Sequence, residues 1–290
     1  IADMKLLEGD PVLASTVIDM YANCGLFVEA KELLCDIPAQ DAISWTALIA
    51  GNTKHGQGNE ALNCFKQMHC EGVLPNSVTL VCTLKACGSA RSLKQGQEIH
   101  AKICIQGLLI KDVIVGNALI DMYGKCGVVT EAHEVFDMLL ERDTISWNAL
   151  IIGYAEQNHT TEVLKLFSRM PSEGILPDSV TYITILRVFG DFAINCVQEL
   201  HMKISEMGFL DRDPFIGNTL VDTYANCRLL LEAQEVFEML PIRDTISWNA
   251  LIGGYVKHGF AEEALDCFKE MLIEGVCEDA ITFIYVLKAC

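Results

Sequence analysis

Apolar residues along the chain recur at spacings of three and four positions. One such set is Leu164, Phe167 and Met170, and two more sets with the same spacing are Leu62, Phe65, Met68 and Leu265, Phe268, Met271. This spacing places apolar side chains on one face of a helix, whereas a strand would need alternation. Polar or Gly-rich breaks, such as those that begin at His55 and Gln157, separate consecutive apolar segments. The pattern therefore predicts pairs of helices joined by short turns.

The helical pairs belong to a repeat. The stretch Asp-x-Ile-Ser-Trp-x-Ala-Leu-Ile occurs three times, and its tryptophans, Trp45, Trp147 and Trp248, lie 102 and 101 residues apart. Recurrence at constant spacing indicates an array of units rather than one irregular core. The predicted units are 11–41, 42–76, 77–112, 113–143, 144–178, 179–213, 214–244 and 245–279, with partial units at 1–10 and 280–290. Because so short a unit cannot bury its apolar stripe alone, the units are expected to stack into an all-α solenoid with a concave face.

The charge of the chain counts against ordinary phosphate binding. Its formal net charge is −18. Proteins that bind nucleic acid through the backbone gain affinity from Lys and Arg, and this chain has few to spare. Any nucleic-acid binding would therefore depend on base contacts. No uncharged run reaches about 18 residues, so we expect no membrane span.

Thirteen cysteines are present, and several occupy equivalent repeat positions, for example Cys24, Cys126 and Cys227. A free cysteine packs as a small hydrophobic residue. We therefore expect free thiols and a reducing compartment rather than a disulfide framework.

The unit lengths and motifs together resemble a known family. Units of 31, 35 and 36 residues, Ser-Trp-Asn-Ala-Leu-Ile openings, Gly-Ile-Leu-Pro-Asp endings and the stretch Asn-Ala-Leu-Ile-Asp-Met-Tyr-Gly-Lys-Cys-Gly resemble pentatricopeptide repeats. The alternation of lengths resembles the PLS subclass of land-plant organellar RNA-editing factors. By that resemblance, 11–41, 113–143 and 214–244 are S-type units, 42–76, 144–178 and 245–279 are P-type, 77–112 and 179–213 are L-type, and 1–10 and 280–290 are partial L-type units. It also implies one right-handed α-solenoid superhelix over 1–290, no cofactor, and a location in the chloroplast or mitochondrion.

The resemblance further implies binding of single-stranded organellar RNA, one base per repeat. The fifth and last residues of each unit would select the base: Ser15/Asp41, Thr46/Asn76, Val81/Asp112, Asn117/Asp143, Asn148/Asp178, Ile183/Asp213, Asn218/Asp244 and Asn249/Asp279. The second residues of successive units would sandwich the base: Val12, Ile43, Val78, Ile114, Ile145, Val180, Phe215 and Ile246.

The family's code translates these pairs into a footprint. Ser/Asp implies G, Thr/Asn implies A and Asn/Asp implies U. Val81 and Ile183 carry no hydrogen-bonding group, so their units are expected to discriminate poorly. The implied footprint is 5′-GAnUUnUU-3′.

Simpler interpretations of the same positions stay open. Apolar second residues could pad the core between repeats. A terminal Asp could cap the next helix, although capping does not explain why fifth residues are polar in S-type and P-type units and apolar in L-type units. Lys54, Lys125 and Lys257 share the thirteenth position and could contact phosphates or lie in solvent. The thirteenth residues of the other S-type and P-type units are not cations: they are Asn23, Glu156 and Asn226.

Catalysis has no residue set to support it. His69-Cys-Glu71 is half of a zinc-deaminase signature, but no Pro-Cys-x-x-Cys accompanies it. We therefore expect no enzyme activity and no metal site, and a deaminase supplied by a C-terminal domain outside this sequence or by another protein. The alternative function is a protein-binding α-solenoid scaffold, which the acidic charge suits equally well. The two are compatible, because L-type units in the family can bind small accessory editing factors.

Overall fold

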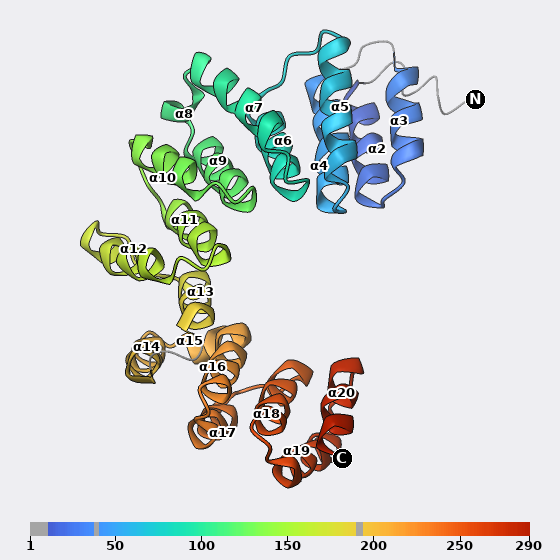
Figure 1. Ribbon diagram of the computed structural model, residues 1–290. Coiled ribbons are helices and arrows are strands. Elements are labelled where there is room, and N and C mark those ends of the chain that lie inside the picture. Colours follow the sequence, from blue (N-terminus) through green and yellow to red (C-terminus); the bar gives the residue numbers. More distant parts are fainter. Residues whose placement is uncertain (1–10, 38–40, 190–193) are drawn as a thin grey trace. The chain divides into compact units, whose positions relative to one another are not determined.

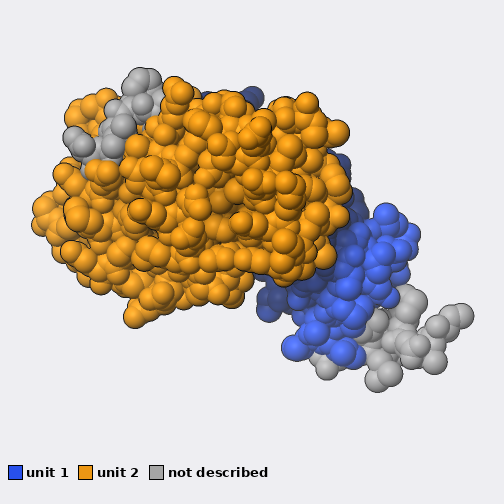
Figure 2. All heavy atoms as spheres, turned by 90° about the horizontal axis from the view of Figure 1, so that it is seen from below, with its two compact units in different colours: residues 1–157 blue, residues 158–290 orange. Residues whose placement is uncertain are grey.

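The computed structural model describes residues 11–37, 41–189 and 194–290, and every element in these ranges is a helix, which confirms the all-α class. The partial unit predicted at 1–10 lies outside the described residues. The chain separates into two compact units, Ile1–Gln157 and Asn158–Cys290 (Figure 2). None of the helices in the described ranges has the length and apolar character needed to cross a membrane.

One helix begins at the first residue of each predicted repeat, and we call these the first helices. They are α2 (Pro11–Asn23), α4 (Ala42–Lys54), α6 (Ser77–Ser89), α9 (Val113–Lys125), α11 (Thr144–Glu156), α13 (Ser179–Phe189), α16 (Pro214–Asn226), α18 (Thr245–Lys257) and α20 (Ala280–Ala289). A second helix follows in each complete repeat. The second helices are α3 (Phe27–Asp36), α5 (Gly58–Cys70), α7 (Leu93–Ile105), α10 (Val129–Met138), α12 (Thr160–Ser172), α14 (Ile194–Glu206), α17 (Leu230–Met239) and α19 (Ala261–Ile273).

Two helices per unit was an incomplete prediction for units 77–112 and 179–213, which the resemblance assigns to the L type. Each of these units contains a third helix of one turn, α8 (Leu108–Lys111) or α15 (Phe209–Arg212). Gly107 and Gly208 precede them with φ angles of 64° and 67°, a left-handed conformation that glycine adopts without steric cost. The glycine ends the second helix, and the residues after it form one more turn before the terminal Asp.

The first helices form one continuous layer within each compact unit, and the second helices pack against them (Figure 1). In the first unit α2, α4, α6, α9 and α11 contact one another in that order, and in the second unit α13, α16, α18 and α20 do so. The layer arises because the buried faces of neighbouring first helices share one core, as stacking repeats require.

The recurring Trp motif shows how one short stretch builds this layer. Asp143 Oδ1 accepts a hydrogen bond from Ser146 N at 2.8 Å and caps α11. Trp147 is fully buried and meets the ring of Phe136 edge-on, with centroids 4.8 Å apart. Leu150 is buried on the same side. The second and fifth residues of the repeat are left on the opposite side of the first turn.

Candidate nucleic-acid interface

The second residue of every complete repeat is an exposed apolar side chain. The exposed fractions lie between 45% and 73%, for Val12, Ile43, Val78, Ile114, Ile145, Val180, Phe215 and Ile246. Padding of the core between repeats is therefore the wrong interpretation of these residues. Water-exposed apolar side chains at so regular a spacing instead form a surface that an apolar or aromatic ligand face can cover.

Three of the predicted fifth/last pairs are joined by hydrogen bonds. Asn117 Nδ2 donates to Asp143 Oδ1 at 3.1 Å, and Asn218 Nδ2 donates to Asp244 Oδ1 at the same distance. Asn249 Nδ2 donates to Asp279 Oδ1 at 3.0 Å. An ionised carboxylate only accepts hydrogen bonds, so the amide nitrogen must face it. The structure thus brings together Asn and Asp residues that lie 26 or 30 positions apart in the chain.

The asparagines are more enclosed than an open groove would leave them. Asn117, Asn148, Asn218 and Asn249 are only 5–8% exposed. Asn117, Asn218 and Asn249 are enclosed because the Asp that caps the next helix lies directly on the amide. The open surface beside them belongs to the second residues, so a ligand could reach the amides only edge-on.

Four fifth residues that are not asparagine behave differently. Thr46 Oγ1 lies 2.6 Å from Thr79 Oγ1, which in turn donates to Asn76 Oδ1 at 3.0 Å. Ser15 Oγ donates to Val12 O in its own helix, and among the described residues no hydrogen bond joins it to Asp41. The L-type residues Val81 and Ile183 are half-buried and apolar.

The last residue of each repeat also caps the next helix, as the simpler interpretation required. In the repeats that precede P-type and L-type units, the side chain accepts from the backbone N–H three residues on, at Asp41, Asn76, Asp143, Asp178, Asp244 and Asp279. Asp112 and Asp213, which end the L-type units, accept from the N–H two residues on. Capping therefore falls on the same side chains that the resemblance predicts to select the base.

The caps alter the acidity of two of these carboxyl groups. Burial alone would raise the pKa of Asp143, but hydrogen bonds from Ser146 and Asn117 outweigh burial and hold its pKa below the usual range. Hydrogen bonds from Thr282 and Asn249 lower the pKa of Asp279. Both groups are therefore carboxylates at neutral pH and act as acceptors.

The candidate phosphate-contacting lysines all have side-chain partners. Lys54 Nζ donates to Asn23 Oδ1 at 3.4 Å, and Lys257 Nζ donates to Asn226 Oδ1 at 3.0 Å. Lys125 forms an ion pair with Asp121 at 2.7 Å. Each partner belongs to the ninth or thirteenth position of an S-type first helix.

The negative charge of the chain lies off the first helices. The nine first helices contain six Lys or Arg and four Asp or Glu, so they carry +2 and the rest of the chain carries −20. The acidic side chains are concentrated on second helices such as α10 and α17, which contain three acids each and no Lys or Arg. These totals leave out the aspartates that cap the first helices beside the second and fifth residues, so the edge of that face is acidic: Asp41, Asp112, Asp143, Asp178, Asp213, Asp244 and Asp279.

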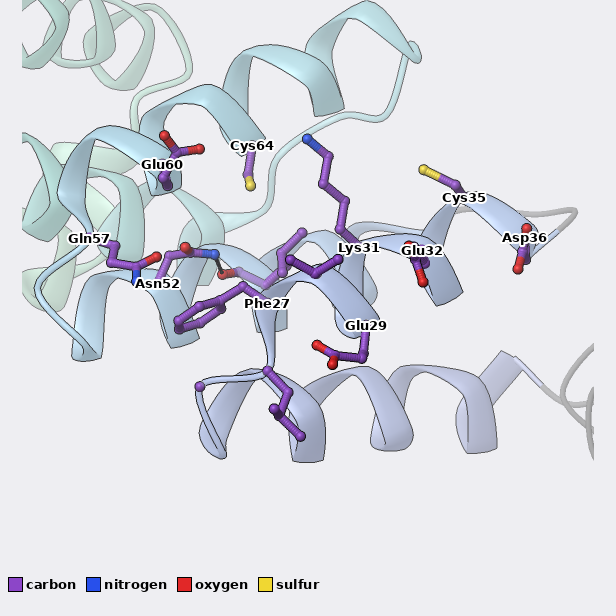
Figure 3. A pocket seen from close by; sticks show the side chains of 14 residues that line it. Phe27, Glu29, Lys31, Glu32, Cys35, Asp36, Asn52, Gln57, Glu60 and Cys64 are labelled. Atoms are coloured by element: carbon purple, nitrogen blue, oxygen red, sulfur yellow. Dashed lines mark hydrogen bonds between the residues drawn. The ribbon is translucent and has the colours of Figure 1, made fainter.

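A hollow of about 860 Å³ lies between α3, α4 and α5, away from that face (Figure 3). Glu29, Glu32 and Asp36 of α3 and Glu60 of α5 line it, with Lys31 between them. It contains none of the predicted site residues. Its carboxylates make it unsuitable for a phosphate.

Sequence reasoning missed the third residue of each repeat, which lies under the fifth/last pairs. This residue is a buried Ser or Thr wherever the preceding repeat has a polar fifth residue: Ser44, Thr79, Ser146, Thr181, Ser247 and Thr282. A signal for it was present, because an Asp or Asn directly before an apolar helical segment predicts an N-cap, and a hydroxyl three residues later can complete a capping box, as Thr79, Ser146 and Thr282 do.

Known proteins share both the sequence pattern and the fold. The profile described as the PPR repeat family matches residues 40–89, 142–191 and 243–290, and a PPR repeat profile matches 12–39 and 117–144. A chloroplastic pentatricopeptide repeat-containing protein of Arabidopsis thaliana is 34% identical over 99% of this chain and 46% of its own length. A mitochondrial one from the same plant is 34% identical over 98% of this chain and 33% of its own length. The chain thus spans less than half the length of these relatives.

Among solved structures, the pentatricopeptide repeat protein PPR10 in complex with an 18-nt psaJ RNA element superimposes with a TM-score of 0.75. The match covers 97% of this chain and 42% of PPR10 at 16% identity, so it supports the solenoid fold alone. With family profiles matching more than half of its residues, the chain belongs to the PPR repeat family.

Proposed function

We propose that this chain binds single-stranded RNA in a sequence-specific manner, one base per repeat. The observation that carries the proposal is the row of exposed apolar second residues on the first turn of successive first helices. Bases have apolar faces and are recognised in single strands by stacking on side chains. A base held between the second residues of two neighbouring repeats presents its edge toward the fifth and last residues.

The polar pairs then supply the choice of base. Asn117 with Asp143, Asn218 with Asp244 and Asn249 with Asp279 each offer amide and carboxylate groups from one hydrogen-bonded unit. Val81 and Ile183 offer none. The proposed footprint is 5′-GAnUUnUU-3′, in which the two undefined positions belong to the L-type units.

Two further observations support RNA over another ligand. The first helices carry six Lys or Arg and four Asp or Glu, so beyond the capping aspartates a phosphate backbone alongside them meets no excess of negative charge. The solved PPR10 structure, which has a similar fold, is a complex with an 18-nt RNA element. Lys54, Lys125 and Lys257 lie at the ends of first helices and would add a modest ionic contribution.

The proposed role is recognition for C-to-U editing of organellar transcripts, with the deaminase supplied separately. The alternation of S-type, P-type and L-type units supports this role. The relatives' names place one protein in the chloroplast and another in the mitochondrion, and we propose an organelle for this chain as well.

Accessory proteins are proposed to bind at the L-type units. A groove borders the second helices at each junction where an L-type unit follows a P-type unit. One of about 330 Å³ lies between α5 and α7, lined by Phe65 and Ile99, and one of about 460 Å³ borders α12 and α14, lined by Phe167 and Met207. Such paired grooves suit small helical or extended protein partners, and a scaffold with no RNA binding is the alternative.

The test is an electrophoretic shift assay that compares a GAnUUnUU oligonucleotide with a scrambled oligonucleotide of the same composition. We expect tighter binding of the ordered sequence, with a shallow dependence on salt because few cations are involved. Equal binding of both oligonucleotides, or no shift for either, would exclude base reading and leave the protein scaffold.

A further inference from the structure

Each repeat with a polar fifth residue is followed by a repeat whose third residue carries a hydroxyl group. Polar fifth residues are followed by a Ser or Thr at this position in all six cases: Ser15 by Ser44, Thr46 by Thr79, Asn117 by Ser146, Asn148 by Thr181, Asn218 by Ser247 and Asn249 by Thr282. The two apolar fifth residues, Val81 and Ile183, are followed by Val115 and Ile216. The third residue therefore changes chemistry together with the fifth residue of the repeat before it, although the two lie on different helices.

The geometry gives this pairing a role. Ser146 Oγ lies 2.6 Å from Asn117 Oδ1 and 2.8 Å from Asp143 Oδ1, and its hydroxyl is buried. Asn117 Nδ2 donates to the same Asp143 oxygen at 3.1 Å. The amide of Asn117 is thus held at its nitrogen by the carboxylate and at its oxygen by the hydroxyl, and the orientation of its plane is fixed at two points.

The same arrangement occurs at the last complete repeat. Thr282 Oγ1 donates to Asn249 Oδ1 at 2.7 Å, and Asn249 Nδ2 donates to Asp279 Oδ1 at 3.0 Å. Thr282 Oγ1 also lies 3.0 Å from Asp279 Oδ1. Threonine and serine therefore perform the same task.

In repeat 214–244 the oxygen of the fifth-residue amide is not held by a hydroxyl group. Ser247 Oγ donates to Asp244 O, the main-chain oxygen, at 2.8 Å instead of reaching the preceding repeat. Asn218 Oδ1 is then a buried acceptor without a hydrogen-bond partner. Asn218 keeps its bond to Asp244, so its amide is held at the nitrogen alone.

We propose that Ser146 and Thr282 are positioning residues for base recognition, which set the orientation of Asn117 and Asn249. This inference rests on the proposed function. With the amide fixed at both ends, each Asn retains one N–H and one oxygen lone pair for a base edge. A donor beside an acceptor complements the carbonyl oxygen and N3–H of uracil, whereas cytosine presents an acceptor at N3 and a donor at N4. A fixed amide therefore favours U over C, and an amide that can rotate discriminates less.

The test compares Ser146→Ala with Ser247→Ala in the intact chain. Both variants keep the backbone N–H that the Asp side chain caps, so both are expected to fold. The probes are GAnUUnUU oligonucleotides with U or C at the fourth position, which faces Asn117, or at the seventh, which faces Asn218. Dissociation constants and thermal unfolding midpoints are measured for each protein.

We expect Ser146→Ala to reduce the U-to-C preference at the fourth position roughly fivefold, the equivalent of about 1 kcal/mol for one hydrogen bond. Its preference at the seventh position stays as in the parent chain. Ser247→Ala leaves both preferences unchanged, and Ser146→Thr retains the parent preference, as Thr282 does at the equivalent place. An unchanged fourth-position preference in Ser146→Ala would overturn the inference, as would an equal effect of Ser247→Ala at the seventh position. A parent chain with no preference for U at the fourth position would instead refute the proposed function.

Discussion

Gly51 in α4 packs directly against Ala22 in α2, so closely that a Cβ atom on Gly51 would lie 2.6 Å from Ala22 Cβ. The same contact recurs at the next two S-to-P junctions, where Gly153 faces Gly124 and Gly254 faces Ala225. These small residues let the first helices approach at each junction, and the spacing between successive second residues depends on that approach.

Replacement of this glycine is therefore expected to destabilise the chain. In an exposed helix, Gly→Ala would stabilise by about 1 kcal/mol. In Gly51→Ala the new methyl group collides with Ala22, and overpacking of this kind costs about 1–3 kcal/mol. We expect a lower thermal unfolding midpoint. The double variant Ala22→Gly/Gly51→Ala removes the closest contact but leaves the Ala22 main-chain oxygen 3.0 Å from the new Cβ atom, so it is expected to recover part of the lost midpoint. A double variant no more stable than Gly51→Ala would show that the contact with the Ala22 methyl group is not the cause.

Replacement of Phe215 is expected to change RNA affinity without changing the stability of the chain. It is the aromatic member of the second-residue row and is 65% exposed. Phe215→Ala is expected to weaken RNA binding by about 1–2 kcal/mol, since stacking on an aromatic side chain contributes this order of energy. The unfolding midpoint stays unchanged, because little surface is buried there.

A matched control is Phe237→Ala. Phe237 is buried against Trp248, with ring centroids 4.5 Å apart, so its loss is expected to cost about 3–5 kcal/mol of stability. An affinity of Phe215→Ala for GAnUUnUU equal to that of the parent chain would show that the exposed second residues do not hold bases.

His100 gives the stability of the chain a dependence on pH. Its Nδ1 lies 2.9 Å from the hydroxyl of Tyr123 in the next repeat, and burial lowers the pKa of this histidine. An unfolded histidine titrates near 6.5, so below that pH the unfolded chain binds more protons than the folded one. The stabilising contribution is complete above about pH 6.5 and decreases as the pH falls toward the folded pKa.

The chain itself provides the control for this effect. At a similar contact between two later repeats, 214–244 and 245–279, Gln234 Oε1 accepts from Tyr255 OH at 2.9 Å. His100→Gln is therefore expected to keep the hydrogen bond and to show a smaller fall in unfolding midpoint between pH 7.5 and 5.5 than the parent chain. Parallel decreases in both proteins would show that His100 does not titrate on unfolding in this range.

Much of the fold was accessible from the sequence, because the period of the apolar residues and the Asp-x-Ile-Ser-Trp motif report local structure. The first helices begin where the repeats were expected to begin, and all thirteen cysteines are free thiols. The extra turn after Gly107 and Gly208 was missed, because a glycine that ends a helix does not show in the sequence whether another helical turn follows it.

Only part of the candidate site could be predicted from the sequence. The sequence could not show whether the apolar second residues are exposed or packed in the core. An apolar residue does not itself indicate which face of its helix is buried. The burial of Asn117 and Asn249 depends on Ser146 and Thr282, which lie 29 and 33 residues later in the chain. Contacts between repeats of that kind arise from stacking and not from the local pattern. The location of the negative charge likewise became clear only once the helices were assigned to two layers.

Selection of bound sequences from randomised RNA, with the parent chain and with Asn148→Thr, tests most directly whether fifth and last residues read bases. The parent chain is expected to enrich GAnUUnUU. In Asn148→Thr the pair with Asp178 becomes Thr/Asp, and the fifth position of the enriched sequence is expected to change from U toward G while the other positions stay the same. Enrichment of the same base by both proteins, or of no pattern by either, would contradict the account.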